Sequence, residues 1–174
     1  MKDDTYIKTC IASTLVILLA ALIKEAILSN IVYLPAVPDI CLICVLFISL
    51  QNGKLFGETS GFFSGLCLDF LSAGPFGLNC LYRTVLGYCG GLFNKVLNTD
   101  GILTPALLVL AASVLKGGLL LCISILFPMV HIRFSPFTMI FFWEIAENTL
   151  LSPFIFKLLN LFKKFIVVKP EAAI

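Results

Sequence analysis

Long apolar stretches run through the whole chain and are separated by short polar breaks. These breaks contain residue types that end helices and form turns: Pro35 and Pro38, Asn52-Gly53, Gly74-Pro75, Asp100-Gly101 and Ser135-Pro136. The pattern predicts six helical segments, over residues 9–29, 37–50, 55–72, 76–97, 102–127 and 137–158. The second has a clean apolar part of only 11 residues, 40–50, so a re-entrant or tilted segment is an alternative there.

The composition places these helices in a membrane. The chain has 174 residues, of which 60% are hydrophobic and 13% charged, and its mean hydropathy is +1.07. Soluble domains are about 25% charged. Six crossings of about 20 residues each would use about 120 residues, which leaves no room for a soluble domain. We therefore expect residues 1–174 to form one all-α integral membrane domain, a polytopic bundle of about six transmembrane helices.

The basic residues predict the orientation of this bundle. Eight of them fall on one side of the six predicted segments: Lys2, Lys8, Lys54, Lys95, Lys157, Lys163, Lys164 and Lys169. Arg133 falls on the other side, with Lys24 near the end of the first segment, while Arg83 and Lys116 lie inside segments. By the positive-inside rule both termini are cytoplasmic, which agrees with an even number of crossings. No small-residue cleavage site follows the first apolar run, so we expect the first helix to remain uncleaved.

Nearly every predicted segment contains an ionisable residue, and such groups should face the interior of the bundle. Asp69 and Arg83 lie on either side of a short turn, where antiparallel helices bring them to similar depth, so we predict an ion pair between them. The remaining polar set is Glu58, Lys116, Glu144 and Glu147, the last two being three residues apart on one helical face. Three interpretations stay open: a network that only holds the bundle together, a proton or substrate path, and contact with a partner's helix.

Small residues form a stripe on the third predicted segment. Gly57, Gly61 and Gly65 are spaced four apart, and Gly87 offers a small residue on the fourth segment. Such stripes let helix backbones approach closely. The stripe is explained either by packing inside the chain or by an interface with another protein.

The chain offers little for catalysis, metal binding or nucleic-acid binding. Its seven cysteines lie in or beside apolar stretches, where a thiol acts as a small hydrophobic group. Cys41 and Cys44 form a C-x-x-C pair, but no second pair or nearby histidine completes a metal site. His131 has no nucleophile paired with it in the sequence. The net charge of +2 is too small to indicate nucleic-acid binding. We expect no enzyme, no cofactor and no metal.

The third segment runs into a turn with a distinctive sequence. Asp69 stands just before Gly74, Pro75 and Gly77, and its carboxylate could accept hydrogen bonds from the amides that open the next helix. A capping role is therefore the simplest interpretation of Asp69. The whole segment 61–79, GFFSGLCLDFLSAGPFGLN, followed by Gly87-Tyr88, resembles the signature of the MreD family of rod shape-determining proteins. The earlier Pro35-x-x-Pro38-Asp39 also resembles that family's pattern at the start of the second helix.

The resemblance implies a non-catalytic membrane scaffold of the bacterial cell-wall elongation machinery, which maintains cell shape. Such a scaffold would bind the membrane protein MreC and, together with the actin-like MreB, help to position the polymerase and transpeptidase that synthesise peptidoglycan. Membrane lipids would be its other partners, and Lys163 and Lys164 suit anionic headgroups.

A transport protein is the main alternative. The substrate-binding S components of energy-coupling-factor vitamin transporters have a similar size and about six helices. They dock through an A-x-x-x-A stripe on the first helix, whereas Ala12, Val16 and Ala20 occupy the comparable positions here. The sequence also lacks an obvious aromatic and polar ligand set, so the scaffold interpretation is favoured.

Overall fold

The structure, a computed structural model, describes residues 2–28, 36–72, 74–94, 96–97, 101–128 and 138–167. Within these ranges the chain contains only helices and their connections, which confirms the predicted all-α class. Several residues used in the prediction fall outside the described residues: Pro35, Lys95, Asp100, His131, Arg133, Ser135, Pro136 and Lys169.

Six of the helices correspond to the six predicted apolar segments. They are α1 (Lys2–Leu22), α2 (Ile40–Asn52), α3 (Lys54–Leu71), α4 (Leu78–Leu92), α5 (Leu103–Leu126) and α6 (Met139–Leu161). The short π-helical element η1 (Ile23–Ile27) continues α1, and α7 (Lys163–Ile166) follows α6. Two stretches, Ile7–Ile27 and Leu103–Leu126, are long and apolar enough to cross a membrane by themselves.

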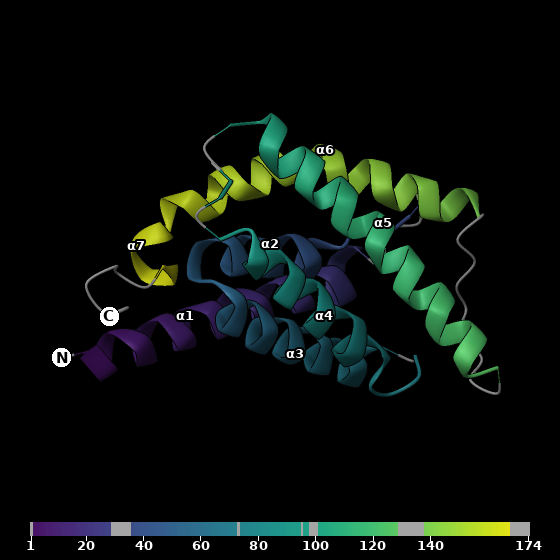
Figure 1. Cartoon of the computed structure of the whole chain (residues 1–174), viewed down its shortest axis with the longest axis horizontal. Helices are drawn as coiled ribbons and strands as arrows, with labels where there is room; N and C mark the ends of the chain where they lie inside the picture. The colour runs from purple at the N-terminus through teal and green to yellow at the C-terminus, as the bar shows by residue number, and fades with distance from the viewer. Residues whose placement is uncertain are drawn as a thin grey trace.

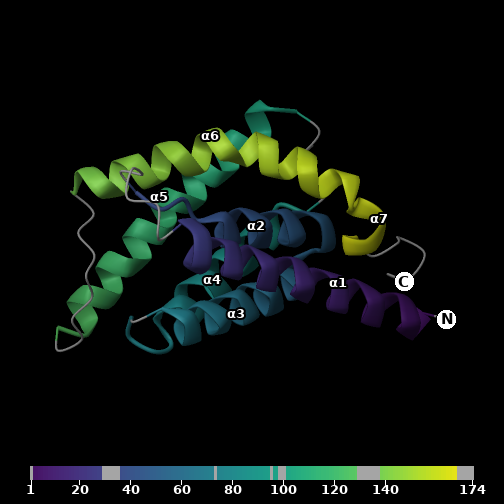
Figure 2. The same cartoon turned by 180° about the vertical axis from the view of Figure 1, so that it is seen from behind.

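Helix α2 is the centre of the molecule. Every residue from Cys41 to Leu50 is buried, and the helix is surrounded by α1, α3, α4, α5 and α6 (Figure 1). Figure 2 shows α1 crossing the back of this core. At 13 residues, α2 is only about 20 Å long, less than the roughly 30 Å hydrocarbon core of a bilayer. Because protein encloses it, its polar ends need not reach either membrane surface.

Helices α2, α3 and α4 fold back on one another through tight connections. Gly53 alone separates α2 from α3 and has a φ of +93°, a left-handed conformation that glycine adopts without strain. Helices α3 and α4 are antiparallel and pack along their whole length. The start of α4 therefore lies beside the start of α2, and both lie beside the end of α3.

Helices α5 and α6 cross the other side of this core as a splayed pair (Figures 1 and 2). Helix α6 packs on α2 through an edge-to-face contact between the Phe47 and Phe156 rings, whose centroids are 5.3 Å apart. The inner face of α5 is buried, at Val109, Ala112 and Leu120. The pair thus covers α2 and leaves its own outer faces apolar and exposed.

Candidate functional site, a buried charge cluster

Asp39 is the centre of a charge cluster inside the protein. It immediately precedes α2, is fully buried, and caps that helix by accepting a hydrogen bond from the amide of Leu42 at 3.2 Å. Its two carboxylate oxygens lie 2.6 and 2.7 Å from Nη2 of Arg83 on α4. Nζ of Lys116 on α5 donates to Oδ2 at 3.0 Å. One carboxylate therefore joins three helices.

Three further polar residues extend the cluster to η1 and α6. Nζ of Lys24 lies 3.8 Å from Oδ1 of Asp39, and Glu144 on α6 forms an ion pair with Lys116. One turn further along α6, the side-chain oxygen of Asn148 accepts a hydrogen bond from the backbone amide of Asp39 at 2.6 Å. We call Lys24, Asp39, Arg83, Lys116, Glu144 and Asn148 the charge cluster.

The cluster is rich in positive charge. It contains three cations and only two carboxylates, and Arg83 and Asp39 are both without exposed surface. The ring of Tyr82 offsets part of this excess, because its centroid lies 5.3 Å from Cζ of Arg83 and 5.7 Å from Nζ of Lys116. Nε and Nη1 of Arg83 are buried and have no hydrogen-bond partner among the described residues. Such a cluster binds its helices together strongly only while every charge keeps its partner.

The predicted ion pair between Asp69 and Arg83 is wrong. The carboxylate of Asp69 accepts hydrogen bonds instead from the amides of Gly77, Asn79 and Cys80, at 3.0 to 3.1 Å. The Asn79 side chain donates a fourth bond at 2.9 Å. These amides open α4, so the carboxylate is fully used as a cap, while Arg83 lies one turn further along α4 and faces Asp39.

The other predicted polar residues divide into two groups. Lys116 and Glu144 belong to the charge cluster. Glu147 lies on the same side of α6, where it accepts a hydrogen bond from the backbone of Ala36, and its Oε2 is buried without a partner among the described residues. Glu58 is exposed on the first turns of α3 and is not part of the cluster.

The predicted glycine stripe lies in the contact between α3 and α4. A Cβ built on Gly57 would overlap the backbone of Gly87, and one on Gly87 would overlap the backbone of Gly57. Built at Gly61 or Gly65, it would overlap the backbone of Arg83 or Cys80. The stripe therefore packs inside the chain, where it brings the α4 backbone and Arg83 close to α3.

The turn between α3 and α4 is held by its backbone conformation and by the Asp69 cap. Gly77 has a φ of +90° and stands immediately before α4, whose fourth residue, Leu81, donates to the Gly77 carbonyl at 3.0 Å. Gly74 and Pro75 form the middle of the turn. Phe70 and Phe76 stack edge to face across it, with centroids 5.2 Å apart. The turn fixes where α4 begins, and with it the positions of Asn79 and Arg83.

The ion pairs, helix caps and glycine contacts described above all serve to hold helices together. Among the described residues no group of three or more histidine, cysteine or carboxylate side chains could hold a metal ion.

A family model described as rod shape-determining protein MreD matches residues 7–162, from α1 to α6. The chain belongs to the MreD family. No curated protein and no solved structure gives a significant match.

Members of the MreD family are polytopic membrane proteins of the cell-wall elongation machinery, which determine rod shape and are not catalytic. In this MreD chain the segment 61–79, which resembles the family signature, supplies glycines of α3 that pack against α4, the Asp69 cap and the Gly77 that precedes α4. The Pro38-Asp39 step that starts the second helix supplies the central carboxylate. Both motifs thus contribute to the packing of helices around the charge cluster.

Sequence reasoning missed the residue that holds the cluster together. Asp39 follows Pro38 at a helix start, so its sequence context indicates a cap, which it also is. Its three cationic partners are 15, 44 and 77 residues away along the chain. Charge counts gave no signal either, because the six predicted segments contain six carboxylates and five cations, so several pairings were possible.

Proposed function

We propose that this chain is a non-catalytic membrane scaffold that crosses the bacterial cytoplasmic membrane about six times and binds an MreC-like membrane protein. Through that protein and MreB, it would help to position the wall-synthesising polymerase and transpeptidase. The match to the MreD family from α1 to α6 carries this proposal.

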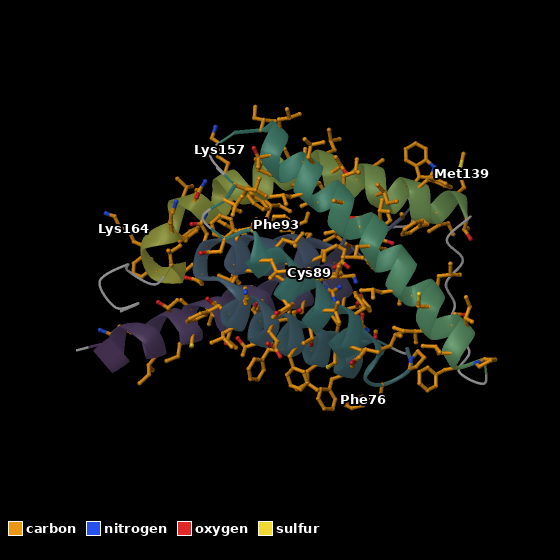
Figure 3. All side chains as sticks on the ribbon, in the orientation of Figure 1. Phe76, Cys89, Phe93, Met139, Lys157 and Lys164 are labelled. Carbon is orange, nitrogen blue, oxygen red and sulfur yellow. The ribbon has the colours of Figure 1, made fainter. Side chains whose placement is uncertain are left out.

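The orientation of the molecule belongs to the same proposal. Figure 1 shows the start of α1 and helix α7 at one end of the molecule, and Figure 3 places Lys157 and Lys164 at that end. Lys8 in the second turn of α1 and Lys54 at the start of α3 lie there as well. We propose that this basic end faces the cytoplasm and its anionic headgroups, in line with the positive-inside rule.

Exposed apolar side chains support a scaffold that works within the membrane. Leu150 and Phe154 lie one turn apart on α6 and are 82% and 68% exposed. Similar side chains line the outer faces of α1, α3, α4 and α5. Lipid tails and the transmembrane helices of a partner both suit such surfaces. The charge cluster holds these surfaces in a fixed arrangement.

Co-purification from the membranes of the protein's own host tests the proposal. The tagged full-length chain should bring down an MreC-like protein together with wall-synthesis enzymes. Recovery of a coupling subunit with ATPases, and no MreC-like protein, would replace the scaffold by a transporter component.

Two matched double substitutions would then locate the partner. Leu150→Ala with Phe154→Ala removes exposed side chains from α6, and Phe62→Ala with Phe63→Ala removes them from α3. Neither pair includes a residue of the charge cluster or of the glycine stripe. Selective loss of the MreC-like protein from one pair, at equal expression, assigns the interface to that helix.

A further inference from the structure

Five of the six long helices, α5 being the exception, carry on or beside them two polar positions that are separated by nearly the same length. One position of each pair lies at the basic end, and the other at the level of the charge cluster. The pairs are Lys8 and Lys24 on α1 and η1, Asp39 and Asn52 around α2, Lys54 and Asp69 on α3, Asn79 and Asn94 around α4, and Glu144 and Lys157 on α6. Spacings of 13 to 16 residues correspond to about 20–24 Å of helix.

Hydrogen bonds between helices keep each set of positions together. At the basic end, the Asn94 side chain donates to the carbonyl of Leu50 at 2.6 Å, and the Asn52 side chain donates to that of Ile166 at 2.9 Å. At the other level, Asp39 joins Arg83, Lys116 and Lys24. We call this second level, which includes Asp69 and Asn79, the charged layer.

The apolar region between the two levels is thinner than a bilayer. A typical hydrocarbon core is about 30 Å thick, so about 6–10 Å would remain beyond the charged layer. On the α5–α6 side, apolar parts of both helices extend through these remaining ~6–10 Å of the hydrocarbon core. Helix α5 continues ten residues beyond Lys116 to Leu126, and α6 begins with exposed apolar residues before Glu144, including Met139 and Trp143.

On the α3–α4 side no long apolar helix extends beyond the charged layer. Beyond Asp69 the chain makes only two more residues of helix and the turn that carries Phe76. Figures 1 and 2 both show α5 and α6 reaching past that turn, and Figure 3 places Phe76 at the turn and Met139 at the far end of α6. The two sides of the molecule therefore present apolar faces of different height.

We propose that the α3–α4 face binds a locally thinned bilayer, in which the lipid headgroups on the side opposite the basic end are drawn down to the charged layer. The partner of this surface is the lipid itself. A short apolar face is accommodated at modest cost by thinning of the adjacent bilayer. Exposed Phe62, Phe63 and Leu81 give the face the apolar surface that lipid tails require.

Two single-tryptophan variants test this proposal. Trp143 is the only tryptophan, so Trp143→Phe gives a silent background. Phe63→Trp then reports from α3 and Leu110→Trp from α5. The two positions are matched, since each lies six residues before the charged layer, at Asp69 or Lys116, and their side chains are 48% and 41% exposed.

Each variant is reconstituted in vesicles of brominated phosphatidylcholines with chains of about 14 to about 22 carbons, and quenching gives the relative lipid affinity. We expect the chain length that binds best at Phe63→Trp to be about four carbons shorter than at Leu110→Trp. An identical optimum at both positions would overturn the proposal. So would the absence of quenching at Phe63→Trp for every lipid, because a second copy would then cover the face. If Phe63→Trp lowers helix content, Phe62→Trp repeats the measurement on the same face.

Discussion

Asp39 is the residue whose loss should cost the fold most. Asp39→Asn keeps the shape of the side chain but leaves Arg83 and Lys116 buried without their shared carboxylate. Removal of one partner from a buried pair costs about 3–5 kcal/mol. We expect the free energy of unfolding to fall by about that amount, measured in detergent through the fluorescence of Trp143.

Two further variants test whether the loss of stability in Asp39→Asn comes from the unpaired buried cations or from any change near Asp39. Lys24→Met removes a cation that lies 3.8 Å away and is partly exposed, so it should leave the free energy of unfolding nearly unchanged. Asp39→Asn combined with Arg83→Met should lose less than the sum of the single losses, because the cation left unpaired is gone. Strictly additive losses would show that the two residues are not coupled.

Asp69 should act through hydrogen bonds to the backbone. Asp69→Ala removes the acceptor for three amides at the start of α4, and loss of a helix cap costs about 1–2 kcal/mol. Thermal unfolding in detergent should show this loss. The control, Glu58→Ala, removes an exposed carboxylate from the same helix and should change stability by less than about 0.5 kcal/mol. Equal losses from both variants would contradict the capping role.

The residues show where sequence reasoning succeeds and where it stops. Local chemistry was readable: Asp69 stands just before a Gly-Pro turn, and its capping role follows from sequence positions less than a dozen residues apart. Partners across the bundle were not readable, since the Asp39–Arg83 contact spans 44 residues and depends on which helices face each other. A rule that pairs the nearest opposite charges gave Asp69 and Arg83, and it failed because the amides of α4 already occupy Asp69.

At the scale of helices, the contact between α3 and α4 depends on residues without side chains. A methyl group at Gly61 would overlap the backbone of Arg83, which cannot move aside as a flexible side chain can. We expect Gly61→Ala to lower the free energy of unfolding by about 1–3 kcal/mol, the cost of overpacking a tight contact. Thermal unfolding of the purified protein measures this change.

Gly118 provides the matched control for that substitution. It lies in the interior of α5 and is exposed, and a Cβ built there has no neighbour within 4 Å. Gly118→Ala should therefore leave stability unchanged or raise it by about 0.5–1 kcal/mol, because alanine favours the helix. A loss at Gly118 as large as that at Gly61 would mean that helix contact is not the cause.

The helices themselves were easier to predict than their lengths. Apolar runs located all six long helices, because the runs between turn residues are unambiguous. The fourth run, 76–97, is longer than α4, which ends at Leu92, since hydrophobicity alone continues through Phe93 and Val96. The second run gave a helix that protein encloses on all sides, a property that no hydropathy pattern distinguishes from exposure to lipid.

For the whole molecule, the charge cluster determines whether the α5–α6 pair stays closed over α2. Lys116 is the link, because it bonds to Asp39 on one side and to Glu144 on the other. Lys116→Met removes both bonds and leaves Glu144 facing a buried carboxylate. We expect α5 and α6 to separate from α2 more often in this variant, which would loosen the packing around Cys41 and Cys44, two buried residues of α2.

Native cysteines allow this opening to be measured without added probes. In the unmodified protein Cys10 and Cys122 are exposed, whereas Cys41 and Cys44 are buried, so N-ethylmaleimide should modify the first pair much faster. Lys116→Met should raise the modification rate of Cys41 and Cys44 by about tenfold or more, which corresponds to about 1.4 kcal/mol in the opening equilibrium. Lys157→Met makes the same chemical change at an exposed position of α6 and should leave these rates unchanged. If Cys41 and Cys44 react at the native rate in Lys116→Met, apolar contacts such as Phe47 with Phe156 hold the pair closed, and the cluster sets only the position of its charges.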